Sequence, residues 1–146
     1  MLEVAGTVLG GRLTRTPTSV VGSHGGETVI FSVTSWGFSV AVLLQTKKAS
    51  FSVGPRGWLR RGLRVEGEPS ELVMRILDDE IKGDILLLAP VEVRLTQNGL
   101  HLERSGGSLA EITAACSLVA KLTARVRVIE KERPVSAWRL ALDRPQ

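Results

Sequence analysis

The chain of 146 residues has a single cysteine, Cys116, so it forms no internal disulfide and offers no cysteine cluster for a structural zinc ion. Long apolar runs are also missing. Stretches such as 40–44 and 85–89 have five residues, whereas a membrane-spanning helix needs about 18. Glu3 lies where a secretory signal carries Lys or Arg. These absences predict a soluble, cytoplasmic protein with no transmembrane segment.

Aromatic residues are scarce, since the chain has three tryptophans, three phenylalanines and no tyrosine, spread through its length. Proteins that bind single-stranded nucleic acid stack bases on grouped aromatic side chains. The sequence therefore argues against a nucleic-acid partner, although the formal net charge is +4.

Motifs of common catalytic and cofactor sites are absent as well. The glycine-rich stretches contain no G-x-G-x-x-G, no G-K-[ST] and no G-x-S-x-G. His24 and His101 have no second histidine or cysteine at metal-ligand spacing. We therefore predict a protein that is not an enzyme, with no catalytic residue, no metal and no cofactor. An enzyme with an unrecognised site around His24 is one alternative.

What the chain does contain is ordinary globular composition, with 43% hydrophobic and 23% charged residues. No repeat or linker divides it. A chain of this length buries about 70% of the surface of its unfolded form, enough for a core of its own. We predict one domain over residues 1–146, in which residues 134–146 are a possible docking tail.

Hydrophobic periodicity gives the order of elements. Residues 2–13 suit a helix or a strand, and we assign a short helix. Apolar and polar residues then alternate through 29–34 and 38–45, joined by a short Ser-Trp-Gly link, as in a hairpin. Further strands are expected at 50–53 and 63–66. The period next becomes helical: Pro69 suits the start of one short helix, and Asp78 or Asp79 caps a second that ends before Pro90.

The stretch 91–105 predicts a β-hairpin. With Asn98 and Gly99 as the central residues of a type I′ turn, Leu95 faces Leu102 and Arg94 faces Glu103. His101 lies on the polar face of this hairpin.

The longest helix is expected to begin after Ser108, which forms a capping box with Glu111. Cys116 falls on its apolar stripe, where a buried thiol is inert. The residues expected to be buried along this stripe are Leu109, Ile112, Cys116, Val119, Leu122 and Val126. Together the elements predict an α+β fold whose mostly antiparallel sheet is covered on one face by two short central helices and one long helix.

Four segments carry a resemblance to a known kind of protein: "LGGRL…VVGSHGGETVIFSV", "FSVGPRGWLRR", a Gly-Glu-Pro that opens a helix ending "RILDDEI…ILLL", and "VEVRLTQNGLHLERSG". Over about residues 9–126 the chain resembles an uncharacterised bacterial α+β domain, a domain of unknown function. The resemblance implies this order of strands and helices and no assigned activity. Some such domains resemble the soluble part of membrane-anchored proteins, whereas this sequence shows no anchor.

The most conspicuous segment is "GPRGWLRRGLR", in which four arginines surround a tryptophan. Tryptophan and arginine are the residue types that most often anchor protein interfaces. Our candidate partner-binding residues are therefore Arg56, Trp58, Arg60, Arg61, Arg64 and Trp138. We predict a non-catalytic module that binds a protein partner or assembles with itself. A second alternative is weak binding of an anionic polymer or lipid surface through these arginines, although nearby glutamates reduce the net charge of residues 56–71 to +1.

Overall fold

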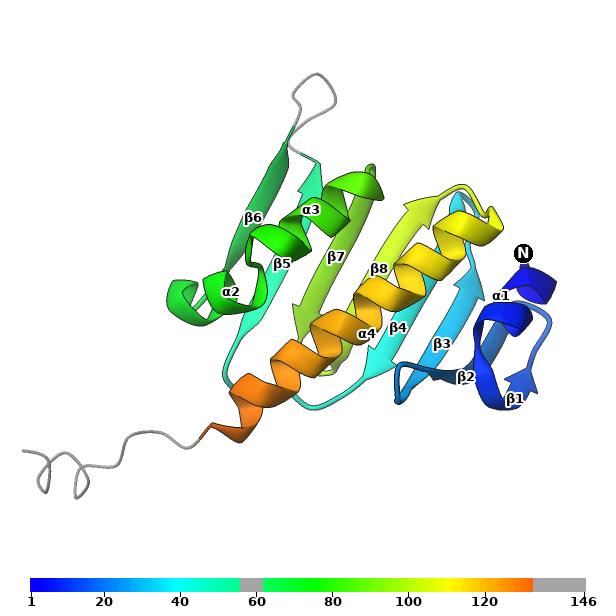
Figure 1. Cartoon of the computed structure of the whole chain (residues 1–146), viewed down its shortest axis with the longest axis horizontal. Coiled ribbons are helices and arrows are strands. Elements are labelled where there is room, and N and C mark those ends of the chain that lie inside the picture. Colours follow the sequence, from blue (N-terminus) through cyan, green and yellow to red (C-terminus); the bar gives the residue numbers. More distant parts are fainter. Residues whose placement is uncertain (56–61, 133–146) are drawn as a thin grey trace, which may run out of the picture.

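The computed structural model describes residues 1–55 and 62–132 (Figure 1). These residues form one antiparallel sheet of eight strands, in the order β1-β2-β3-β4-β8-β7-β5-β6, and four helices. The strands are β1 (Gly10–Arg15), β2 (Ser19–His24), β3 (Glu27–Val33), β4 (Gly37–Leu43), β5 (Ser50–Pro55), β6 (Leu63–Glu68), β7 (Val91–Thr96) and β8 (Gly99–Ser105). The helices are α1 (Leu2–Val8), α2 (Ser70–Ile76), α3 (Asp79–Leu87) and α4 (Leu109–Lys131). The predicted α+β fold is confirmed.

The core lies between one face of the sheet and the helices. Val40 on β4 faces Phe31 on β3 and Leu102 on β8, and all three side chains are fully buried. The rings of Phe31 and Phe38 stack with their centroids 5.4 Å apart. Figure 1 shows the four helices on the same side of the sheet, with α4 crossing it diagonally. Alternation along the strands therefore places every second side chain in the core and the others on the opposite face.

The capping box of α4 is confirmed. The backbone N–H of Glu111 donates to Ser108 Oγ (3.2 Å), and the N–H of Ser108 donates to Glu111 Oε1 (3.1 Å). The expected stripe is buried from Ile112 to Val126, but Leu109 is 57% exposed. Side chains of a helix lean toward its N-terminus, so the first residue of α4 points past the end of the helix instead of onto the sheet.

The helix assigned to residues 2–13 was wrong beyond Val8, and strand β2 was missed. Leu9 already has an extended backbone (φ −82°, ψ 137°), and β1 begins at Gly10. Gly11 has a φ of 71°, a conformation that favours glycine. The glycines thus end α1 and turn the chain into a strand that pairs with β2.

The hairpin of β7 and β8 forms, but its predicted register was wrong by two residues. Leu95 faces Leu100 and Arg94 faces His101, so the turn centres on Gln97 and Asn98. Gly99 has a φ of 143°, and a Cβ there would lie 2.3 Å from the carbonyl oxygen of Val42. Neither Gln97 nor Asn98 has a positive φ, which excludes a type I′ turn, and Gly99 follows them with a positive φ while allowing the close approach of β8 to β4. A shift of two residues keeps every side chain on its predicted face.

Candidate functional site

The face of the sheet that points away from the helices is called here the uncovered face, because none of the described helices packs on it (Figure 1). It has an uncharged half on β2, β3 and β4 and a charged half on β8, β7, β5 and β6. The side chains of the uncharged half are Ser19, Val21, Ser23, Thr28, Ile30, Ser32, Ser39, Ala41 and Leu43. The charged half presents His101, Glu103, Glu92, Arg94, Arg64, Glu66 and Glu68.

The strand register shows how the two halves join. One row of directly facing residues crosses seven neighbouring strands, in the order β2-β3-β4-β8-β7-β5-β6. Its members, in the same order, are Val21, Ile30, Ala41, His101, Arg94, Ser52 and Glu66. The row is aliphatic as far as Ala41 and polar from His101 onward. Val21, Ile30 and Ala41 are each only partly buried, and Leu43 on the same half is 72% exposed. A strip of apolar surface therefore faces solvent beside a patch of charge.

Polar contacts on the charged half run along individual strands. Arg94 Nη2 lies 3.2 Å from Glu92 Oε1, and His101 Nε2 lies 4.0 Å from Glu103 Oε1. Glu92 and Glu103 face each other directly across β7 and β8, an arrangement that is unfavourable for like charges. Exposed pairs of this kind contribute little to stability, so these charges are available for contacts with another molecule.

A hollow of about 510 Å³ opens at one end of the uncovered face. Trp36, Arg64, Glu92 and Glu103 are among the residues that line it. The Trp36 side chain is 87% exposed, and Thr34 Oγ1 holds its turn by accepting the N–H of Gly37 (3.0 Å). The sequence did not point to Trp36, although its place in the link between two predicted strands marks it as a residue at a sheet end.

Of the predicted partner-binding residues, the structure places Arg64 on β6, in the charged half and beside the hollow. Its Nε lies 3.8 Å from Glu66 Oε1. The other candidates, Arg56, Trp58, Arg60, Arg61 and Trp138, lie outside the described residues. Pro55, the last residue of β5, faces Leu63 on β6 and also lines the hollow.

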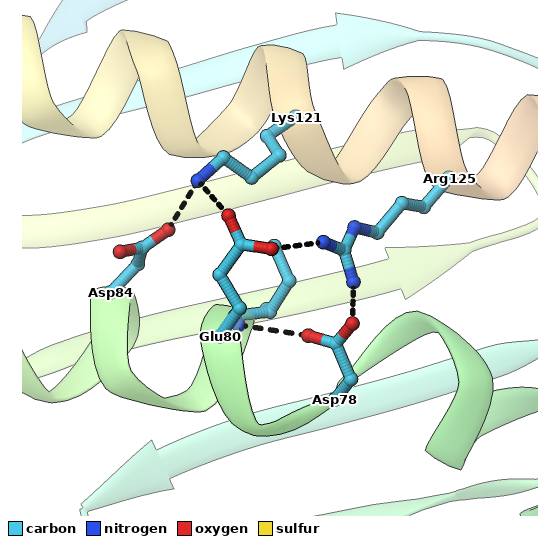
Figure 2. A network of polar contacts seen from close by, with 6 residues as sticks. Asp78, Glu80, Asp84, Lys121 and Arg125 are labelled. Atoms are coloured by element: carbon cyan, nitrogen blue, oxygen red, sulfur yellow. Dashed lines mark hydrogen bonds and ion pairs between the residues drawn. The ribbon is translucent and has the colours of Figure 1, made fainter.

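The acidic residues at the start of α3 lie on the helix side of the sheet and bind two cations of α4 (Figure 2). Lys121 Nζ lies 3.0 Å from Glu80 Oε1 and 2.8 Å from Asp84 Oδ2. Arg125 contacts Asp78 and also Glu80, the latter at 2.8 Å. Figure 2 shows the five side chains meeting between the two helices.

This network keeps its members charged. Asp78 Oδ1 also accepts the N–H of Ile81 (3.0 Å), as an N-cap does. That backbone hydrogen bond, followed by the one from Arg125, lowers the pKa of Asp78. The carboxylates of Asp84 and Glu80 raise the pKa of Lys121. The interpretation of this acidic run as a helix cap is confirmed, and the network also fastens α3 to α4.

The other reactive side chains lie apart from one another. His24 Nε2 lies 3.2 Å from Ser117 Oγ on α4, whereas His101 is on the uncovered face. Cys116 is fully buried in the core, and burial raises the pKa of its thiol to about 11. Within residues 1–55 and 62–132, no three side chains of the metal-binding types gather. None of the helices in that part of the chain combines the length and apolar character required to cross a membrane.

The chain matches no family model and no curated protein. Its fold is similar to the crystal structure of a mycobacterial protein, the trehalose monomycolate transport factor A (TtfA), with a TM-score of 0.55. The two share 12% sequence identity over 88% of this chain and 84% of that chain. At this identity the likeness shows the fold alone. It agrees with the resemblance to an uncharacterised bacterial α+β domain.

Proposed function

We propose that this protein is a non-catalytic module that binds a protein partner through the uncharged half of its uncovered face. The observation that carries the proposal is the aliphatic row of Val21, Ile30 and Ala41, which faces solvent on three adjacent strands. The cores of protein interfaces are depleted in charge, and their rims are polar. The uncharged half supplies such a core, and the ion pairs of the neighbouring strands supply one side of the rim.

The form of this surface also favours binding. Three hydrogen-bonded strands hold the row in a fixed position, so little conformational entropy is lost when a partner docks. Serines at Ser19, Ser32 and Ser39 form a second row beside the aliphatic one. Their short side chains let another backbone approach closely, and the hydroxyl of the partly exposed Ser32 can donate and accept hydrogen bonds.

Site-specific photo-crosslinking in cells tests the proposal. A photoreactive amino acid at Ile30 is expected to capture a defined partner, and a second substitution, Ala41→Arg, is expected to abolish that capture. Val128 on α4 provides the matched control position, because it is 60% exposed and lies on the helix layer. The proposal is contradicted if positions 30 and 128 give the same crosslinked products, or if Ala41→Arg leaves the crosslinking from position 30 unchanged.

A second candidate function is weak binding of an anionic lipid surface through Arg56, Arg60, Arg61 and Arg64. Two observations favour it: the exposed Trp36 and Arg64 line the same hollow as Pro55 at the end of β5, and the structural neighbour is a trehalose monomycolate transport factor. Each basic residue close to an anionic membrane contributes about 1 kcal/mol.

Vesicle co-sedimentation tests this candidate. Binding to phosphatidylserine vesicles is expected to exceed binding to phosphatidylcholine vesicles, to weaken as salt is added, and to disappear in the double variant Arg60→Glu/Arg61→Glu. The control variant Arg12→Glu on β1 removes the same kind of charge at the far edge of the sheet. If both variants bind like the wild type, the candidate is refuted.

A further inference from the structure

The two edges of the sheet differ in regularity. At one edge the register of β1 on β2 shifts between Gly10 and Thr14, as in a β-bulge. Bulges twist an edge and hinder pairing with another strand. At the other edge β6 pairs with β5 over all six of its residues without a break. In the part of the chain that the structure describes, no strand lies on the outer side of β6.

Side chains along β6 form a pattern that is complementary to itself. Arg64 and Glu66 lie on the uncovered face, and Val65 between them lies on the helix side, where it is 39% exposed. The contact of 3.8 Å between Arg64 and Glu66 is loose, and their side chains are 56% and 68% exposed. Both charges can therefore exchange this contact for a closer one.

We propose that a second copy of this chain pairs with β6 in antiparallel fashion, about a two-fold axis at Val65. In a continuous sheet, directly facing residues have their side chains on the same face. A two-fold axis perpendicular to the sheet must therefore lie midway between the two copies of one residue. An axis at Arg64 places two arginines opposite each other, and an axis at Glu66 places two glutamates opposite each other. The axis at Val65 instead forms two Arg64–Glu66 pairs between the copies.

Apolar side chains near β6 also favour pairing with a second copy of the chain. At the axis, the exposed side chains of the two copies of Val65 face each other on the helix side. Helix α2 packs beside β6, where Val73 lies under 3 Å from the position that a Cβ on Gly67 would occupy. On the same helix Met74 is 68% exposed. Pairing of the edges thus adds backbone hydrogen bonds, two ion pairs and apolar contact.

The pairing goes beyond the proposed function, because it uses the edge and not the uncovered face. Two copies related in this way form one sheet of sixteen strands with both uncovered faces on the same side. Either property can therefore fail while the other persists.

Charge reversal in the full-length protein tests the pairing. Sedimentation velocity over a range of concentrations is expected to show a monomer–dimer equilibrium for the wild type. Arg64→Glu and Glu66→Arg should each raise the dimer Kd at least about tenfold, because like charges then face each other at two symmetric positions. The double variant Arg64→Glu/Glu66→Arg restores both pairs and should return the Kd to near the wild-type value. Arg12→Glu on the β1 edge is the control and should leave it unchanged.

Cysteine crosslinking tests the register. The variant Val65→Cys is expected to form an intermolecular disulfide under mild oxidation, because directly facing residues place their Cα atoms about 4.5–5.5 Å apart, which is within the range that a disulfide spans. Glu68→Cys, away from the axis, should not. The proposal is overturned if the wild type is a monomer at all concentrations, or if the single charge reversals have no effect on the dimer Kd. It is also overturned if the double variant fails to dimerise while its circular dichroism and melting temperature remain native. Crosslinks from Ile30 report separately on the uncovered face.

Discussion

The buried thiol of Cys116 predicts a loss of stability at alkaline pH. Burial raises its pKa from 9.0 to about 11, so between these values the folded protein keeps a proton that the unfolded chain releases. The stabilisation associated with the neutral thiol is complete below about pH 9 and is lost as the pH rises through 11. A shift of two pKa units corresponds to about 3 kcal/mol in the free energy of unfolding.

Denaturant unfolding of the wild type and of Cys116→Ala at intervals from pH 7 to pH 11 measures this effect. Cys116→Ala removes the titrating group, so the free energy of unfolding should fall less steeply with pH in the variant. At neutral pH the variant should be the less stable protein, because truncation leaves a small cavity. The two curves should therefore converge by about 2 kcal/mol as the pH approaches 11. Parallel curves would refute the reasoning, as would complete labelling of the native thiol within minutes at pH 8.

Three further predictions concern the helices and the β8 strand. Arg125→Met should accelerate amide hydrogen exchange across α3, because the variant loses the contacts with Asp78 and Glu80, whereas Arg94→Met on the uncovered face should not. Ser108→Ala should lower the stability by about 1 kcal/mol through loss of the α4 cap, which thermal unfolding will show. Gly99→Ala should strongly destabilise the fold, since a Cβ would lie 2.3 Å from a backbone oxygen, whereas Gly83→Ala, with open space around it, should stabilise α3 by about 0.5–1 kcal/mol in the same assay.

Local patterns predicted the fold well where one signal dominated. Alternation identified β3 and β4, and the capping box placed the start of α4 at its observed residue. Prediction failed where glycine served a long-range purpose. Gly99 suggests a type I′ turn by its place after Asn98, yet the turn lies on Gln97 and Asn98, neither of which has a positive φ, and a side chain at Gly99 would clash with β4, which is distant in sequence. In the first fifteen residues the glycines interrupt the hydrophobic pattern of a helix as well as that of a strand, so the start of β1 was predicted as part of a helix.

The uncovered face could not be predicted from the sequence, for a different reason. Val21, Ile30 and Ala41 become neighbours only through the pairing of β2, β3 and β4, and each is an ordinary strand residue by itself. His101 joins the row because β8 inserts between β4 and β7, an order that no local pattern specifies. The sequence instead drew attention to the arginine-rich segment, whose charge is visible without knowledge of the topology.

The width of the apolar strip limits the kind of partner that the uncovered face can hold. The aliphatic row of Val21, Ile30 and Ala41 is bordered by the serine row, whose members include Ser39, which is itself only 7% exposed. An obligate interface resembles a domain core cut in half and needs several adjacent apolar rows. A single row interleaved with hydroxyls remains compatible with water when no partner is bound. The surface is therefore better suited to a partner that exchanges than to a permanent subunit.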